Sequence, residues 1–137
     1  MGIHRAAWII EKVDSFEIAK NEQPDIILVD EAQFLDESEI LKLVKIVDFL
    51  DIPVRCYGLK TDFKLRLFKG SELLLCYADT IKEIECICTF CKRKAIANMR
   101  LINNVPIFDG EQIFIGGNKR YIVVCRKCYM DRYRSIF

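Results

Sequence analysis

Four of the seven cysteines occur as two Cys-x-x-Cys pairs, Cys88 with Cys91 and Cys125 with Cys128. One such turn presents two thiolates to a single ion, and two turns can complete the closed tetrahedral shell of a structural zinc site. Bound zinc would keep the thiols deprotonated and make the fold of this region depend on metal. The doubled spacing favours zinc over ordinary buried cysteines, and over a redox pair, which would leave the other pair unexplained.

The remaining cysteines leave one alternative open, a slipped register in which Cys86 replaces Cys88. Cys56, in a predicted strand, and Cys76, in an apolar helix, are interpreted as core residues. Because zinc would pin both ends of segment 92–124, we expect this segment to form a tethered lid rather than a free loop.

A second candidate site lies in the stretch IILVDEAQF, where an apolar run ends in two adjacent acids, Asp30 and Glu31. This is the pattern of the second nucleotide-binding motif of P-loop enzymes, in which one acid holds magnesium and a neighbour can act as general base. The two acids could equally be solvated residues at the point where the strand emerges. The phosphate-binding motif G-x-x-x-x-G-K-[ST] occurs nowhere among the six glycines.

The residues on either side of the acids predict a β-α-β unit. Residues 25–30 form an apolar run of strand length, and Pro53 introduces a second run, VRCYGL. Between them Asp36 and Glu39 have capping-box spacing, and apolar residues recur at helical intervals through residue 50. We therefore expect parallel strands joined by a right-handed crossover, with ligands gathering at their carboxyl ends.

After a short helix that Ser71 can cap, the chain changes character near residue 81. Turn residues such as Asn103-Asn104 separate short apolar runs that we predict to be strands. These predicted strands cover residues 84–88, 94–102, 111–117 and 121–125. We therefore predict an α/β protein with a parallel-sheet nucleotide-binding domain at residues 1–80 and a small, β-rich zinc-binding domain at residues 81–137.

Composition narrows the classes of partner. The 21 Lys and Arg residues nearly balance the 20 Asp and Glu residues, so no strong field attracts nucleic acid or a membrane surface. Basic ends with interleaved aromatic residues, such as CRKCYMDRYR, suggest a zinc-ribbon nucleic-acid binder, but the balanced charge argues against it. Apolar runs are too short to cross a bilayer, and we expect a soluble, cytoplasmic protein without nucleic-acid or membrane partners.

Six stretches, in this order and at these spacings, resemble the type II, zinc-containing thymidine kinases, and the enterobacterial-like version in particular. The resemblance covers about residues 25–130. The stretches are VDEAQF (29–34), YGLKTDF (57–63), LFKGSELLLCYAD (67–79), CTFCKRKA (88–95), IGGNKRY (115–121) and VCRKCY (124–129).

The resemblance implies an α/β nucleotide-binding domain with a zinc-held lasso over the nucleoside. The implied reaction, part of pyrimidine deoxynucleoside salvage for DNA synthesis, transfers the γ-phosphoryl group of ATP to the 5′-hydroxyl of thymidine or deoxyuridine. The implied cofactors are Mg²⁺ with ATP and a structural Zn²⁺, and the implied assembly is a homotetramer. Asp30 matches the magnesium-associated aspartate, and Glu31 matches the general base.

The resemblance also implies the other site residues. Phe63 matches a ring that stacks on the base, and the backbone of residues 112–116 matches the stretch that contacts the thymine edge. Main-chain amides and carbonyls can satisfy the donors and acceptors of a pyrimidine edge. The implied ATP and magnesium residues are Asp30, Glu31, Ala32 and Gln33, the nucleoside residues are Phe34, Leu59, Phe63, Asn98, Gln112, Ile113, Phe114, Ile115, Gly116 and Tyr121, and the zinc ligands are Cys88, Cys91, Cys125 and Cys128.

One departure from the family stands out. Its members begin with a strand, a phosphate loop and a helix upstream of the acids, and Met1 lies too close to Asp30 to accommodate them. We therefore expect a truncated P-loop-type sheet that is inactive and poorly soluble by itself, whether it is a truncated product, has a misassigned start codon or is a true short protein. The alternative function is a non-catalytic zinc-ribbon module that binds a nucleoside or a protein partner.

Overall fold

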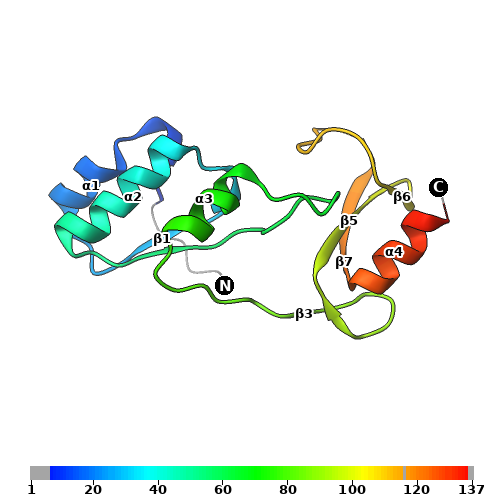
Figure 1. Cartoon of the computed structure of the whole chain (residues 1–137). Helices are drawn as coiled ribbons and strands as arrows, with labels where there is room; N and C mark the ends of the chain where they lie inside the picture. Colours follow the sequence, from blue (N-terminus) through cyan, green and yellow to red (C-terminus); the bar gives the residue numbers. More distant parts are fainter. Residues whose placement is uncertain (1–6, 116, 136–137) are drawn as a thin grey trace, which may run out of the picture. The chain divides into compact units, whose positions relative to one another are not determined.

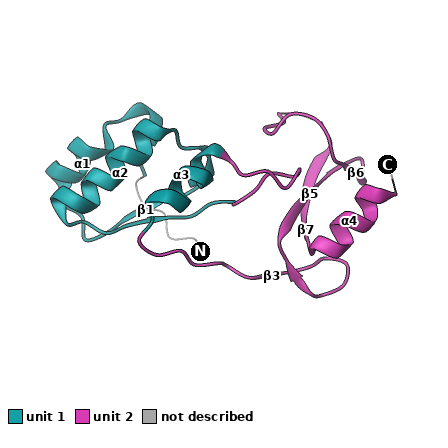
Figure 2. Ribbon diagram, in the orientation of Figure 1, with its two compact units in different colours: residues 1–59, 69–78 teal, residues 60–68, 79–137 magenta. Residues whose placement is uncertain are grey.

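The computed structural model describes residues 7–115 and 117–135. The chain divides into two compact units, shown in Figure 2. Unit 1 contains the chain up to Leu59 together with residues 69–78, and unit 2 contains residues 60–68 together with the chain from Asp79 onward. The division into domains at residue 80 stays a prediction.

Unit 1 confirms the predicted β-α-β arrangement. Strands β1 (Ile27–Val29) and β2 (Val54–Cys56) pair in parallel, and helix α2 (Glu37–Leu50) connects them. Helix α1 (Ser15–Glu22) packs against α2, as Figure 1 shows. The remaining elements of the unit are helix α3 (Lys69–Tyr77) and the 3-10 turns η1 (Ile10–Lys12) and η2 (Ala32–Phe34).

The core of unit 1 lies where α2 covers the sheet. Ile40, Leu43 and Ile46 recur along one face of α2 and are buried, because residues three or four positions apart share a face of a helix. They pack in one cluster with Val29 of β1 and Ala32 of η2. The same packing that stabilises α2 therefore fixes the carboxyl end of β1.

Unit 2 is built on a three-stranded antiparallel sheet in the order β6-β5-β7. A two-stranded pair, β3 with β4, and helix α4 complete the unit. The bounds are Cys86–Ile87 for β3, Lys94–Ala95 for β4, Ala97–Ile102 for β5, Val105–Ile107 for β6, Lys119–Val124 for β7 and Arg126–Arg134 for α4.

The sequence predictions need three corrections, two in unit 2 and one in unit 1. Residues 111–115 form no strand, and β6 forms instead at Val105–Ile107, directly after the Asn103-Asn104 turn. Helix α4 was not predicted, because its sequence RKCYMDRYR is strongly polar and buries only Tyr129. In unit 1, Ser71 does not cap α3, which begins two residues earlier at Lys69.

Alternate residues of β5 divide between two faces of the sheet. Ala97, Met99 and Leu101 belong to the buried cluster that also contains Val124 and Tyr129. Asn98, Arg100 and Ile102 lie on the opposite face. Among the described helices, none is long and apolar enough to cross a membrane.

The start of α2 provides a direct test of the fold. The Asp36 carboxylate accepts the Glu39 N–H, and the Glu39 carboxylate accepts the Asp36 N–H, each at 2.9 Å. We expect Asp36→Ala to lower the free energy of unfolding by about 1 kcal/mol, because the Glu39 N–H loses its partner. Asp36→Ser, which retains a capping oxygen, should lose less in urea unfolding, and equal losses would contradict the capping role.

Candidate functional site

The four cysteines of the predicted metal site come together in unit 2. The Sγ atoms of Cys88, Cys91, Cys125 and Cys128 all lie within 4.8 Å of one another, and those of Cys91 and Cys125 are 3.5 Å apart. Zinc–sulfur bonds of about 2.3 Å place tetrahedral ligands about 3.8 Å apart. The four thiols therefore fit a tetrahedral metal ion, and the slipped register through Cys86 is not needed.

Local hydrogen bonds prepare two of these thiols to act as ligands. Burial acts to raise the pKa of Cys88, but hydrogen bonds with the backbone of Cys125, Cys91 and Phe90 lower it to about 6. The N–H of Cys128, which donates to Cys125 Sγ at 3.4 Å, lowers the pKa of Cys125. Burial raises the pKa of Cys128 to about 12. Because the thiolate is the ligand form, the lowered pKa values favour Cys88 and Cys125 as metal ligands.

The two acids lie at the carboxyl end of β1, where the backbone turns sharply. Glu31 adopts a left-handed conformation, with φ of 51° and ψ of 36°. Its N–H donates to the Asp30 carboxylate at 2.9 Å, and Gln33 Nε2 donates to Glu31 Oε2 at 2.5 Å. Both acids are exposed, whereas Ala32 and Gln33 are buried. The turn therefore presents the two carboxylates and keeps the two following side chains inside.

Gln33 uses both ends of its amide to join the two strand ends. Besides donating to Glu31, it accepts the Leu59 N–H on Oε1 at 3.1 Å. The Leu59 carbonyl in turn accepts the Ser71 hydroxyl at 2.6 Å. Leu59 is thus held on both of its backbone polar groups, and its position is coupled to that of the Glu31 carboxylate.

Two glycines allow this close packing around Gln33. A Cβ on Gly58 would lie 2.5 Å from Gln33 Oε1, and a Cβ on Gly70 would lie 2.6 Å from the Gln33 carbonyl oxygen. Sequence reasoning missed Gly58, Gly70 and Ser71. The signal for Gly58 was its place inside the predicted strand VRCYGL, where a glycine often marks a close approach by another group.

Several predicted nucleoside residues converge in unit 2 around Arg100, which sequence reasoning also missed. The guanidinium lies 3.6 Å from the centroid of the buried Phe63 ring. It donates to the hydroxyl of Tyr121 and to the carbonyl of Gln112. Phe114 also lies near it, with 5.4 Å between the ring centroid and Arg100 Cζ.

The other predicted nucleoside residues are placed less closely. Asn98 lies on the same face of β5 as Arg100, opposite Val123 of β7. Ile113 and Ile115 are exposed, and Gly116 lies outside the described residues. Phe34 and Leu59 belong to unit 1, and both are exposed.

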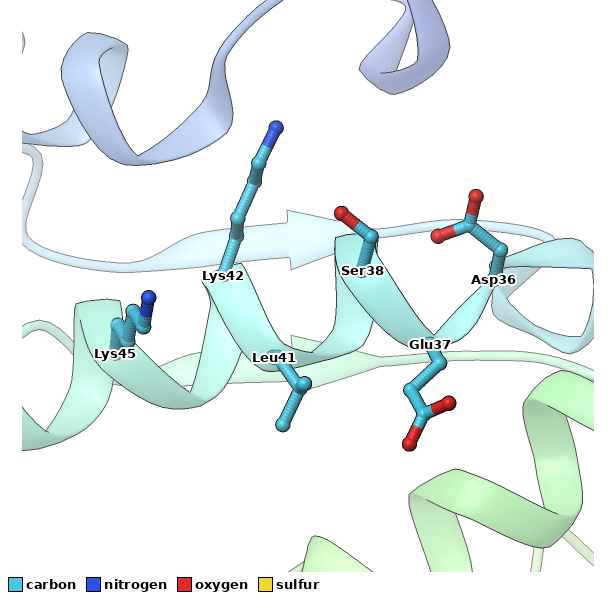
Figure 3. Close-up of a pocket in the computed structure, with 6 residues that line it drawn as sticks. All are labelled: Asp36, Glu37, Ser38, Leu41, Lys42 and Lys45. Carbon is cyan, nitrogen blue, oxygen red and sulfur yellow. The ribbon is translucent and has the colours of Figure 1, made fainter.

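A hollow on the outer side of α2 contains none of these residues. All six of its lining residues come from the first turns of α2 and its cap, and Figure 3 shows Lys42 and Asp36 pointing to one side and Glu37 and Leu41 to the other. Asp36 is engaged in the helix cap, and Lys42 forms an ion pair with Asp14 at 3.9 Å. The hollow therefore offers no set of converging groups to a ligand.

Comparison with known proteins gives a consistent result. The family model described as thymidine kinase matches residues 3–129. The thymidine kinase of Lactiplantibacillus plantarum is 48% identical over 132 residues, which cover 94% of this chain and 69% of that protein. The thymidine kinase of Shouchella clausii is 48% identical over 128 residues, covering 91% and 67%. That of Streptococcus gordonii is 49% identical over 132 residues, covering 94% and 69%.

The packing of Gly70 against the Gln33 turn predicts a change in stability opposite to the one that usually follows replacement of a helical glycine by alanine. Glycine-to-alanine changes inside helices normally stabilise by about 0.5–1 kcal/mol. Gly70→Ala should instead lower the free energy of unfolding by about 1–3 kcal/mol, because the new methyl group would overlap the Gln33 and Ala32 carbonyls. Urea unfolding measures the change, with the exposed helical Asp48→Ala as the matched control. A more stable Gly70→Ala protein would contradict the close approach.

Proposed function

The chain belongs to the thymidine kinase family, and from this premise we propose that Glu31 is the general base for phosphoryl transfer from ATP to thymidine. The family makes the protein a phosphotransferase with thymidine and ATP as substrates. In the proposed step, the 5′-hydroxyl oxygen of thymidine attacks the γ-phosphorus as its proton passes to the Glu31 carboxylate. The bond from the γ-phosphorus to the bridging oxygen of ATP breaks, and ADP leaves with that oxygen.

The conformation of Glu31 carries this proposal. A non-glycine residue in the left-handed region costs free energy and persists where the surrounding structure imposes it, often at functional sites. Here the surroundings are the hydrogen bond from Gln33 to Oε2 and the packing of Gly58 and Gly70 around Gln33. Because Gln33 engages Oε2, we assign proton acceptance to Oε1.

The other site residues are assigned around Glu31. Asp30, exposed beside it, is proposed to hold the Mg²⁺ of MgATP, which when bound neutralises charge on the phosphates. Ala32 and Gln33 are buried, so their contribution to the ATP site would be made by backbone and by positioning. Phe34, Leu59, Phe63, Asn98, residues 112–116 and Tyr121 are proposed to surround the nucleoside.

The four cysteines are proposed to hold a structural Zn²⁺. The support is the tetrahedral fit of four thiols, a ligand set typical of structural rather than catalytic zinc. The ion would join the two ends of segment 92–124, which carries Asn98, residues 112–116 and Tyr121. The family-type homotetramer stays a prediction, and no observation favours the non-catalytic zinc-ribbon module.

Glu31→Gln tests the general base. The amide keeps the size of the carboxylate and can still accept from Gln33, but it cannot take a proton at neutral pH. We expect kcat for transfer of labelled γ-phosphate from ATP to thymidine to fall by about 10²–10⁴-fold. The dissociation constant for thymidine, measured by calorimetry, should change little.

Glu37→Gln, which changes an exposed acid in the first turn of α2, is the matched control and should retain full activity. Equal and measurable kcat values for Glu31→Gln and the unaltered protein would sink the assignment of Glu31. Loss of thymidine affinity with unchanged kcat would move its role from chemistry to binding.

Metal content and metal removal test the zinc site. We expect one zinc ion per chain by elemental analysis, and a chelator should unfold unit 2, seen as loss of near-ultraviolet circular dichroism and of thymidine binding. Cys91→Ser should lose the metal, whereas Cys76→Ser, which changes an exposed cysteine outside the cluster, should retain it. A Cys91→Ser protein with full zinc content would contradict the ligand set.

A further inference from the structure

Arg100 is a buried cation in the middle of β5. Its side chain is 1% exposed, and its neighbours along the strand, Met99 and Leu101, belong to the core of unit 2. Within the described part of the chain, no acidic side chain forms an ion pair with it. Burying a charge without a counterion is costly unless its polar atoms are satisfied, so the partners of this guanidinium require a physical explanation.

The guanidinium is satisfied by neutral acceptors from two separate segments. Nη1 donates to the Glu111 carbonyl at 2.8 Å, Nη2 donates to the Gln112 carbonyl at 3.0 Å, and Nε donates to the Tyr121 hydroxyl at 2.9 Å. Its planar face lies over the Phe63 ring in a cation–π contact. One side chain thus contacts four different residues, three of which are proposed to surround the nucleoside.

Strand register explains why these groups meet. Arg100 and Tyr121 are directly opposite in the β5–β7 pairing, so their side chains share a face of the sheet. The Asp109-Gly110 turn, with Gly110 at φ of 119°, then leads into the Glu111 and Gln112 carbonyls. These carbonyls accept from the guanidinium, and the segment forms no strand.

A second buried charged residue, Asp62, also holds the segment that contains Glu111 and Gln112. Asp62 is buried, and its Oδ2 accepts from Gln112 Nε2 at 3.1 Å. Its Oδ1 accepts the N–H groups of Lys64 and Arg66 at 2.8 and 3.0 Å, which closes the loop that carries Phe63. Gln112 therefore connects Arg100 through its carbonyl to Asp62 through its amide.

We propose that Arg100 is the positioning residue of the thymine-binding part of the site. It holds the 111–112 backbone, the Tyr121 hydroxyl and the Phe63 ring in one fixed arrangement before the nucleoside binds. This inference rests on the proposed function, because that proposal gives these groups their nucleoside contacts. A lysine would keep the charge but not the planar fork that reaches two carbonyls and a hydroxyl at once.

The test compares Arg100→Lys and Arg100→Met with Arg120→Lys, which changes an exposed arginine on neighbouring β7. The backbone order parameters of residues 111–115 are measured by nitrogen-15 NMR relaxation without nucleoside. We expect these order parameters to fall below about 0.6 in both Arg100 variants, while zinc content and the order parameters of β5 and β7 stay unchanged. Thymidine should bind both variants about tenfold more weakly or worse, and Arg120→Lys should match the unaltered protein.

Several outcomes would overturn the proposal. Unchanged order parameters at residues 111–115 in both variants would show that Arg100 does not hold the segment. Wild-type order parameters in Arg100→Lys or Arg100→Met would show that charge or volume alone suffices. Lower order parameters with unchanged thymidine affinity would separate the segment from base binding. If thymidine fails to bind the unaltered protein, the proposed function fails, and the order parameters still decide whether Arg100 positions the segment.

Discussion

The convergence of the two cysteine turns is the constraint on which unit 2 depends. Cys88 and Cys125 are themselves members of its buried cluster, together with Met99 of β5 and Val124 of β7. An ion bound by the turns would therefore close segment 92–124 and complete one end of the core in the same event. Because β7 ends at the second turn, this closure also restricts the register in which it pairs with β5.

In each unit, one buried planar side chain fixes a segment of the candidate site. In unit 1 the Gln33 amide links Glu31 to the Leu59 backbone, and in unit 2 the Arg100 guanidinium links two backbone carbonyls to the Tyr121 hydroxyl. In each case a rigid group with several donors or acceptors replaces the hydrogen bonds that a longer strand would supply. The segments can then remain irregular, because their backbone does not have to pair with a neighbouring strand.

The sequence predicted correctly the features that depend on residues close together in the chain. The capping box and the apolar spacing of Ile40, Leu43 and Ile46 located α2, and the doubled Cys-x-x-Cys spacing located the four cysteines that could hold a metal ion. The strand prediction for residues 111–117 was wrong for the part that the structure describes, because a short apolar run such as Ile113-Phe114-Ile115 is also compatible with an irregular segment. Its carbonyls accept from Arg100, which is eleven and twelve positions away in sequence, and no local pattern records this contact.

Arg100 nevertheless left a signal in the sequence. A charged residue between Met99 and Leu101, in a strand whose flanking positions are apolar, must either reach solvent or find buried partners. The core lies on the opposite face of β5, so Arg100 could reach solvent unless its own face of the strand is also covered. Phe63 covers that face, and its tertiary position cannot be read from the sequence around Arg100. The thymidine kinase motifs therefore contain the groups that we propose to touch substrates, whereas the residues that hold those groups emerge from packing between segments distant in the chain.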